Sequence, residues 1–367
     1  MLGHRHIAGP LLAVAVHAVA RLANAAPGDL DPPFGTGGQV VLPMPSSSHL
    51  ADLAIQVDGK LVVVGFSASQ GLVMRLLPDG TPDTAFAAGG RAVLPGALPV
   101  RVALEPDGDI VVAGLATTPF LSVFVARLLT DGTLDSGFGA GGVVSTSIFV
   151  FPPGGGVVQS ESGVCGLAVV ADGDIVVGVS ISVEDGAAFF NAMGAVRYGP
   201  AGSVSGAFGG HPEFGTSPSF PGGVGVAPAI SAFNFCSAMA RDGAGGILLG
   251  GQQISGGSPT TLGFEPILAR LLSDGRPDLG FGPGTSGLAS VPGFVCPGVN
   301  SSVHGVAPDA GGRLVVTGSG FDLARYDAGG NSDPSFGTDG VSNLLGLYPS
   351  ADLAISATGH ILTAGRR

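Results

Sequence analysis

The sequence predicts an all-β protein, a β-propeller of about six four-stranded blades whose last blade is incomplete. Three observations favour this fold. A phenylalanine motif recurs six times along the 367 residues. Tight-turn sequences of the Asp-Gly type separate short apolar runs. Those runs are apolar without alternation, as in strands covered on both faces. Four-stranded sheets stacked face to face around an axis bury both faces in this way.

The repeat is fixed by three residue types at constant spacing. An arginine stands eleven residues before each of the last five phenylalanines, and an aspartate stands three residues before five of the six. The phenylalanines that begin the units are Phe34, Phe86, Phe138, Phe208, Phe281 and Phe336. Pairs that recur once per unit are expected to be structural, with a guanidinium bridging the turn between two strands. The predicted pairs are Arg75 with Asp83, Arg127 with Asp135, Arg270 with Asp278, and Arg325 with Asp333.

The third unit departs from this pattern. Ser205 stands where the other units have the aspartate, opposite Arg197. We therefore expect the third blade to be softest at this point.

The turn sequences predict where the strands lie. Glycine at the second position of Asp58-Gly59 or Asp107-Gly108 supplies the positive φ of a tight hairpin at no steric cost. In the first unit we expect four strands, near residues 39–42, 50–57, 60–65 and 72–77. The later units repeat this order.

Three elements together resemble a known repeat. They are an aspartate three residues before Phe-Gly-x-x-Gly, a strand Asp-Gly-(Lys/Asp)-(Ile/Leu)-Val-Val-x-Gly, and a strand Ala-Arg-(Leu/Tyr)-x-x-Asp-Gly. The pattern is similar to the delta-60 repeat family of secreted bacterial proteins and, distantly, to the NHL-type propeller repeat. The resemblance runs from Leu30 to the C-terminus. It implies a propeller-like fold and export, and it transfers no catalytic residue because the motif residues belong to the scaffold.

Charge excludes two classes of partner. The net charge is −12, and Lys60 is the only lysine. Nucleic acid is not an expected partner because counterion release needs a basic surface. Anionic membrane surfaces are not expected for the same reason.

The N-terminus predicts export. Residues 1–25 have a basic start, an apolar middle and the small residues of Ala23-Asn-Ala25, so we expect a signal peptide cleaved near Ala25. An uncleaved anchor is the alternative, but the apolar stretch falls short of the ~20 residues that span a bilayer. Residues 26–367 are expected to form one domain, secreted, periplasmic or on a bacterial cell surface, without membrane insertion.

Length variation suggests where a partner binds. The insertions lie in repeats three to five, near residues 147–164, 180–192, 211–235, 252–264 and 285–304. In an up-and-down meander these connections are expected to share one face, opposite the Asp-Gly turns. We expect an extracellular protein or a polysaccharide to bind there, since binding residues gather on loops held by a rigid scaffold. The alternative is neutral drift of tolerant loops.

The cysteines allow a disulfide after export. The pairing expected is Cys236 with Cys296, or Cys165 with Cys236, and one of the three thiols is left over. Three buried cysteines without a bond are the alternative.

No metal, cofactor or catalytic residue is predicted. Asp79-Gly80-x-x-Asp83 and its copies offer oxygen atoms, but they lack the ligand density of a calcium loop. Acid–base candidates on the long connections are His211, His304, Glu161, Glu184, Glu213 and Glu265. Surface loops hold such residues by default, so they do not by themselves indicate an enzyme.

The sixth unit stops before its arginine strand. Either the ring closes with a short blade or the sequence is a truncated form of a longer one, and truncation is our expectation. The unpaired edge is then prone to pair with another strand. The function predicted is a binding or surface-interaction module. The alternatives are a hydrolase or lyase acting on an extracellular sugar or lactone, by analogy of fold alone, and a structural envelope protein.

Overall fold

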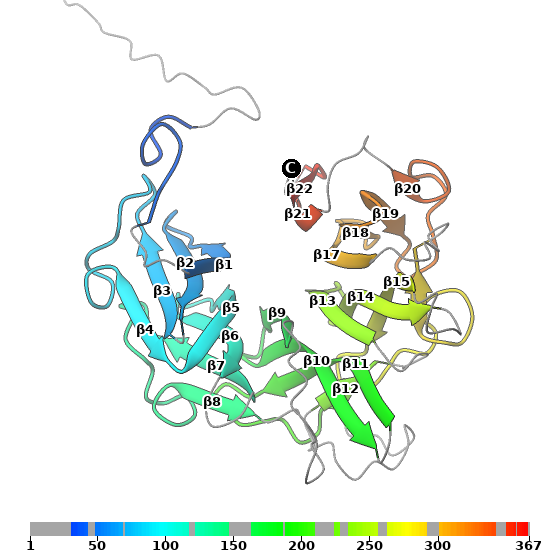
Figure 1. Cartoon of the computed structure of the whole chain (residues 1–367), viewed down its shortest axis with the longest axis horizontal. Coiled ribbons are helices and arrows are strands. Elements are labelled where there is room, and N and C mark those ends of the chain that lie inside the picture. The colour runs from blue at the N-terminus through cyan, green and yellow to red at the C-terminus, as the bar shows by residue number, and fades with distance from the viewer. Residues whose placement is uncertain are drawn as a thin grey trace, which may run out of the picture.

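Figure 1 shows a ring of β-sheets around a central axis in a computed structural model of the chain. The structure describes residues 31–42, 48–68, 70–116, 122–146, 163–185, 188–209, 224–227, 234–255, 263–291, 301–342, 350–356 and 358–365. Every regular element in these residues is a β-strand.

The strands form five four-stranded sheets and one two-stranded sheet, which we number as blades one to six. Blade one contains β1 (Ser48–Ile55), β2 (Leu61–Ser67), β3 (Gln70–Leu76) and β4 (Arg91–Pro95). Blade two contains β5 (Ala97–Leu104), β6 (Ile110–Ala116), β7 (Ser122–Leu128) and β8 (Val143–Thr146). Blade three contains β9 (Val164–Val169), β10 (Ile175–Asp185), β11 (Ala188–Tyr198) and β12 (Val224–Val226).

The remaining strands form blades four, five and six. Blade four contains β13 (Asn234–Arg241), β14 (Ile247–Ser255), β15 (Gly263–Leu271) and β16 (Leu288–Ser290). Blade five contains β17 (Ser302–Pro308), β18 (Leu314–Ser319), β19 (Leu323–Tyr326) and β20 (Val341–Ser342). Blade six contains β21 (Ser350–Ile355) and β22 (Ile361–Gly365).

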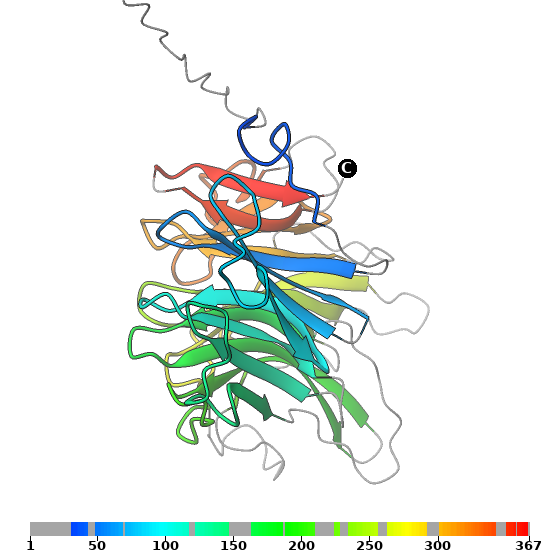
Figure 2. The same ribbon diagram turned by 90° about the vertical axis from the view of Figure 1, so that its left-hand side faces the viewer.

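Each sheet is an antiparallel meander in which strands pair in sequence order. The first strand of each blade lies nearest the axis in Figure 1, and the sheets stack against one another when the ring is seen from the side in Figure 2. The chain is therefore a β-propeller of six blades, the last with two strands among the described residues. This confirms the fold class that the sequence predicts.

The predicted order of strands within the unit was wrong by one strand. The structure has no ladder at 39–42, where Gln39 makes only an isolated bridge with Gly35. The strand that follows each phenylalanine motif is the outermost strand of the preceding blade, as β4 is in blade one. The sequence repeat and the blade are therefore out of phase, and the last five motif phenylalanines each lie inside a connection between a third and a fourth strand.

A β-bulge recurs in each innermost strand and explains one glycine of the repeat. The register shifts at Ala51 in β1 and at Val100 in β5. Directly opposite, a Cβ on Gly65 or Gly114 would collide with the carbonyl oxygen of the innermost strand. Gly251 and Gly318 make the same approach in blades four and five, and only glycine allows it, so this glycine of the second strand is a packing requirement in four blades.

The core lies between the blades. Four clusters of buried side chains fill the junctions of blades one and two, two and three, three and four, and four and five. Second and third strands supply side chains to the junctions on both their faces, for example Val111 and Val112 in adjacent clusters. This two-sided burial is what the apolar runs without alternation predict.

The predicted signal peptide lies outside the described residues. In the part of the chain that the structure describes, no helix is long and apolar enough to cross a membrane.

Candidate binding surfaces

The arginine–aspartate pairs of the repeat are all present as ion pairs. The guanidinium Nε donates to an aspartate Oδ2 at 2.7–2.8 Å in the pairs Arg75–Asp83, Arg127–Asp135, Arg270–Asp278 and Arg325–Asp333. Each arginine also lies over the ring of its own motif phenylalanine, at 4.5–4.9 Å from guanidinium carbon to ring centroid. We call the arginine, aspartate and phenylalanine of one repeat the clasp.

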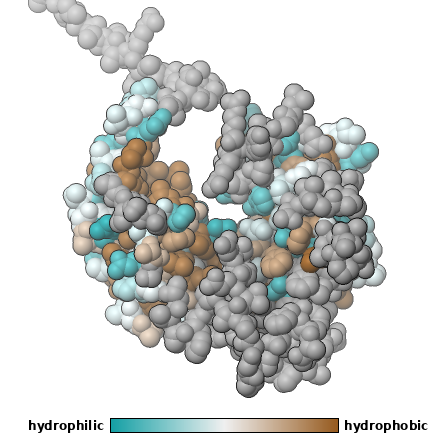
Figure 3. All heavy atoms as spheres, in the orientation of Figure 1, coloured by the Kyte–Doolittle hydropathy of each residue, from teal (hydrophilic) through white to brown (hydrophobic). Residues whose placement is uncertain are grey.

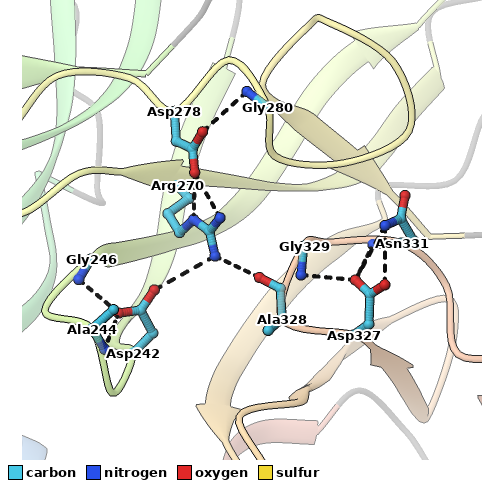
Figure 4. A network of polar contacts seen from close by, with 10 residues as sticks. All are labelled: Asp242, Ala244, Gly246, Arg270, Asp278, Gly280, Asp327, Ala328, Gly329 and Asn331. Atoms are coloured by element: carbon cyan, nitrogen blue, oxygen red, sulfur yellow. Dashed lines mark hydrogen bonds and ion pairs between the residues drawn. The ribbon is translucent and has the colours of Figure 1, made fainter.

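The clasp also reaches across to the next blade, which the sequence does not indicate. Nη1 of Arg127 in blade two donates to the carbonyl oxygen of Pro200 in blade three, at 2.7 Å. Arg270 reaches Ala328 of blade five in the same way, at 2.5 Å (Figure 4). Arg75 reaches Thr130 of blade two. Every acceptor lies in the tight turn after the next blade's own third strand.

The backbone and the phenylalanine ring repeat this contact. The amide that follows the phenylalanine donates to the same turn, as Ala87 donates to the carbonyl of Asp131 at 2.7 Å. The ring of Phe86 packs against Gly132. A Cβ atom added to Gly132 would lie 2.7 Å from a carbon of that ring. The clasp therefore joins neighbouring blades through side-chain and backbone hydrogen bonds and through the packing of the phenylalanine ring. The constant spacing of eleven residues follows, because the arginine and the phenylalanine must meet at one turn of the next blade.

Arg197 pairs with carboxylates that lie outside the repeat position of the aspartate. It has no aspartate at the position of Ser205, but its Nε donates to Asp174 at 2.6 Å and its Nη2 donates to Asp172 at 2.7 Å. Its Nη1 still reaches the next blade, at the carbonyl of Ser273. Blade three thus replaces the missing carboxylate with two from its β9–β10 turn. The expectation that the third blade is softest at this point stays a prediction.

The pKa is lowered for three carboxyl groups of the clasps, those of Asp83, Asp135 and Asp333. For Asp83, burial alone would raise the pKa, but the hydrogen bonds from Arg75 and from the amide of Ala85 outweigh burial, and the pKa is lowered. The amide of Gly137 and the guanidinium of Arg127 lower the pKa of Asp135. The carboxylates of Asp83 and Asp135 are therefore ionised in the folded protein, where they accept hydrogen bonds from guanidinium groups.

The disulfide joins Cys165 of β9 to Cys236 of β13, with a Cα–Cα distance of 5.7 Å. It therefore ties the innermost strands of blades three and four. Because Cys236 is bonded to Cys165, the predicted pair Cys236–Cys296 was wrong. Cys296 itself lies outside the described residues. Sequence separation could not choose between the two pairings, since both link adjacent repeats.

Two clefts lie on the face that carries the Asp-Gly turns, each between neighbouring blades. The larger, of about 500 Å³, lies between blades one and two and is lined by Lys60, Arg75, Glu105 and the turns around them. The smaller, of about 310 Å³, lies between blades three and four, beside Arg197 and Arg241. Arg75 lines the first cleft and Arg197 lines the second.

The oxygen atoms considered for calcium already have partners. Oδ1 of Asp79 accepts hydrogen bonds from the amide and the hydroxyl of Thr81, and Oδ2 of Asp83 accepts a hydrogen bond from Arg75. A separate acidic group, Glu105 with Asp107 and Asp109, brings one oxygen from each within 4.8 Å of the others. Burial raises the pKa of Glu105, and the Arg127 guanidinium lies 3.6 Å from its carboxylate. This arrangement is an ion pair at the edge of a cleft.

The prediction that the long connections share the face opposite the Asp-Gly turns is confirmed in part. The β10–β11 hairpin pairs over eleven residues on each strand, out to Asp185 opposite Ala188, whereas the β6–β7 hairpin pairs over seven. At about 3.3 Å per residue, four additional residues extend the hairpin by roughly 13 Å. The predicted insertion at 180–192 is therefore largely regular strand, and Figure 1 shows β10 and β11 as the longest ribbons of blade three.

The insertion at 211–235 was placed on the wrong face in part. Residues 210–223 connect Phe208 to β12, and β12 begins with Val224 opposite Val196, next to the Asp-Gly edge of the sheet. That portion therefore joins the sheet at the edge opposite the β10–β11 hairpin. Only residues 227–233, between β12 and β13, join it at the hairpin edge. The error follows from the phase error in the strand order.

Of the acid–base candidates, two have described side chains. Oε2 of Glu265 accepts a hydrogen bond from Nε2 of Gln253 at 3.2 Å, across the β14–β15 pair. His304 lies at the bulge of β17. His211, Glu161 and Glu213 lie outside the described residues, and the side chain of Glu184 does as well.

A search of curated proteins finds no sequence that matches the chain. A family model described as "Domain of unknown function (DUF5122) beta-propeller" matches residues 56–86 and 105–138. Each matched stretch runs from the turn after the innermost strand to the motif phenylalanine, and so contains the arginine, the aspartate and the phenylalanine of one clasp.

Solved structures resemble the chain at low sequence identity. A putative oxidoreductase (glucose dehydrogenase) of Thermus thermophilus is 17% identical with a TM-score of 0.44, covering 85% of this chain and 89% of that one. A protein of Lactobacillus plantarum is 14% identical with a TM-score of 0.43, covering 85% and 69%. A gluconolactonase of Xanthomonas campestris is 13% identical with a TM-score of 0.39, covering 87% and 84%.

Likenesses of this size assign no activity to the chain. The family match and the six sheets of the structure nevertheless agree with each other. Together they identify the chain as a β-propeller repeat protein.

Proposed function

We propose that the protein is a binding or surface-interaction module of the exported, delta-60-like kind, which holds an extracellular protein or polysaccharide on the face that carries the β10–β11 hairpin. The observation that carries the proposal is the contrast between a uniform scaffold and one extended element. The arginines at the repeat position, Arg75, Arg127, Arg197 and Arg270, tie each of the first four blades to the next blade. The β10–β11 hairpin alone among the described second-to-third hairpins pairs over eleven residues.

A rigid base supports recognition by a projecting hairpin. The Cys165–Cys236 bond and Ser180 anchor the hairpin's base, where Ser180 Oγ accepts a hydrogen bond from the Cys236 amide at 2.9 Å. Because the base of the hairpin is already ordered, less conformational entropy is lost when a partner binds. Binding through elements held by a rigid scaffold is the usual arrangement in folds of this type.

The register of the hairpin allows a sharp test. Ile181 pairs with Ala192, so residues 182–191 can be replaced by Asn-Gly without changing the rest of the ladder. The matched control replaces residues 117–121 of blade two, between the paired Ala116 and Ser122, with the same turn. Both variants are compared with the parent in a pull-down of bacterial envelope polysaccharides and secreted proteins, after circular dichroism has shown the same β-sheet content.

The proposal expects a partner that the parent and the blade-two variant retain and the hairpin variant loses. If all three proteins retain the same partners, the hairpin is not the binding element. If none retains any, the hairpin face does not bind these classes of molecule and the proposal fails.

A further inference from the structure

The innermost strand of blade four ends on a charged residue, whereas the same position in the other blades is apolar. Arg241 ends β13 and pairs with Ile247, the first residue of β14. Among the described residues, the five other innermost strands end at this register position on Ile55, Leu104, Val169, Pro308 and Ile355. The ladder and the packing of a blade therefore do not need an arginine here.

Arg241 lines the smaller of the two clefts, the one of about 310 Å³ between blades three and four. The residue is partly buried, and within the described part of the chain its guanidinium forms neither an ion pair nor a hydrogen bond. Arginine carries five N–H donors, and donors that are partly withdrawn from water are stabilised by an acceptor. The guanidinium of Arg241 is therefore available to an acceptor that enters the cleft.

The carboxylate next to Arg241 in sequence is engaged elsewhere. Oδ1 of Asp242 accepts hydrogen bonds from the amides of Ala244 and Gly246, at 3.0 and 2.7 Å. Oδ2 of Asp242 lies 3.7 Å from Nη1 of Arg270, and Figure 4 shows this carboxylate turned toward Arg270. Asp242 thus stabilises its own turn and the clasp of blade four, and it does not pair with Arg241.

Arg197 adds further donors to the same cleft. Its Nε donates to Asp174, its Nη2 donates to Asp172 and its Nη1 donates to the carbonyl of Ser273. Three of its five N–H groups are therefore used among the described residues, and two remain. The cleft is thus lined by two arginines that both have unused donors.

The lining of this cleft differs in charge from that of the larger cleft. Two arginines and one aspartate line the smaller cleft, whereas one lysine, one arginine and four carboxylate residues line the larger one. The hollow at the centre of the ring differs again, since Figure 3 shows hydrophobic residues of blades one and two along one of its sides. In a chain of net charge −12, the excess of arginine over aspartate in this cleft favours a bound anion.

We propose that the cleft between blades three and four binds the carboxylate of a small organic acid, with Arg241 as its main anchor. The planar fork of a guanidinium matches the two oxygens of a carboxylate, so Arg241 donates two parallel hydrogen bonds to the ligand. Arg197 supplies further donors from the wall of the same cleft. The cleft lies on the face opposite the β10–β11 hairpin, so this site does not depend on the function proposed for that hairpin.

The size and the apolar lining of the cleft fit a compact organic acid better than inorganic phosphate. A volume of 310 Å³ lies at the lower end of the range of about 300–1,000 Å³ for small-molecule sites. Because Asp172 and Asp174 already balance the charge of Arg197, one positive charge remains for the ligand, as a carboxylate requires. The organic part of the acid contacts the apolar residues of the lining, which are Val170, Ala171, Val176, Ala244 and Ile247.

The test titrates cyclohexanecarboxylate into the full chain by isothermal titration calorimetry at constant ionic strength, beside the uncharged cyclohexanecarboxamide and inorganic phosphate. Saturable binding of the carboxylate is expected. Arg241→Leu should weaken it about tenfold or more, because charge-assisted hydrogen bonds are lost. The carboxamide should bind the parent more weakly than the carboxylate by a similar factor. Arg276→Leu, which removes an exposed arginine paired with Asp274, is the matched control and should leave the affinity unchanged.

Three outcomes overturn the proposal. No saturable binding of the carboxylate means that Arg241 only covers apolar surface with its aliphatic stem. Equal affinity of the parent and the Arg241→Leu variant means that the acid binds elsewhere. Phosphate that binds as tightly as the carboxylate means that the cleft holds a free oxyanion and not an organic acid. Leucine occupies the same register position in blade two as Leu104, so the Arg241→Leu variant should fold, and circular dichroism confirms this before titration.

Discussion

Arg127 of blade two donates a hydrogen bond to the carbonyl oxygen of Pro200 of blade three, 73 residues further along the chain. The same arginine is paired with Asp135 and lies over Phe138 within its own blade. One side chain thus connects the turn of its own blade to the turn of the next. Its counterparts at the neighbouring junctions do the same, so the repeated residues of the sequence are the connections between blades.

Removing a clasp arginine should destabilise the protein more than removing an exposed one. Arg127→Met leaves Asp135 without its cation and the Pro200 carbonyl without its donor, and we expect a loss of about 2 kcal/mol in the free energy of unfolding. Arg276→Met is the control, because Arg276 pairs with Asp274 within one exposed turn, a class of pair worth about 0–1 kcal/mol. Urea unfolding measures both. Equal losses would mean that the clasp is an ordinary surface pair.

Gly132→Ala should be more disruptive than Gly89→Ala. Both glycines have positive φ, +88° and +66°, so both substitutions carry backbone strain. A Cβ on Gly132 meets the Phe86 ring, whereas a Cβ on Gly89 meets nothing within 4 Å. Strain alone costs about 1 kcal/mol, and we expect Gly132→Ala to exceed Gly89→Ala by a further 1–3 kcal/mol from overpacking. Thermal unfolding of the two variants gives the difference, and equal melting temperatures would argue against the aromatic contact.

Reduction of the disulfide should loosen blades three and four. The bond closes a loop with a sequence separation of 71 residues, and bonds of this kind typically stabilise by about 2–4 kcal/mol. The double variant Cys165→Ser, Cys236→Ser should therefore unfold at lower urea concentration than the oxidised parent, and a reducing agent should no longer affect it. Peptide mapping without reduction should recover the two cysteines in one linked pair. A linked Cys236–Cys296 pair would contradict the structure.

The protein should lose stability in acid through its clasps. The pKa values of Asp83, Asp135 and Asp333 are lowered from the usual 3.8 in the folded state. The unfolded chain therefore takes up protons first as the pH falls, so the stabilisation is complete above the usual pKa and disappears as the pH passes through the lowered values. Urea midpoints at pH 7 and pH 3 measure the loss. Asp83→Asn should reduce the difference between the two midpoints, and an unchanged difference would exclude Asp83 as a contributor.

The sequence carried enough information for the fold class and the ion pairs because both repeat. Six copies of one spacing are visible without any structure, and a pair such as Arg270–Asp278 is separated by only eight residues. The phase of the blade was not visible. The strand after Phe86 can pair with the strand before it or with the strand after it, and only the observed ladder from Gln70 to Pro95 decides between them.

Contacts between repeats were the other part that the sequence could not supply. The acceptor for Arg75 is the backbone carbonyl of Thr130, and every residue type has such a carbonyl. Cys165, the partner of Cys236, lies at the register shift of β9, a feature that the sequence does not show. The carboxylates that pair with Arg197 belong to the β9–β10 turn, which lies 23 to 25 residues away in sequence, at the start of the neighbouring strand β10.

Hydrogen–deuterium exchange of the Arg127→Met variant tests most directly whether the clasp connects blades. The turn at residues 199–203 belongs to blade three, and its Pro200 carbonyl accepts from Arg127, while its Ala201 carbonyl accepts from the amide of Gly139. The account predicts faster exchange both at Gly139 and in this turn of the next blade. Faster exchange confined to blade two, with residues 199–203 unchanged, would contradict it.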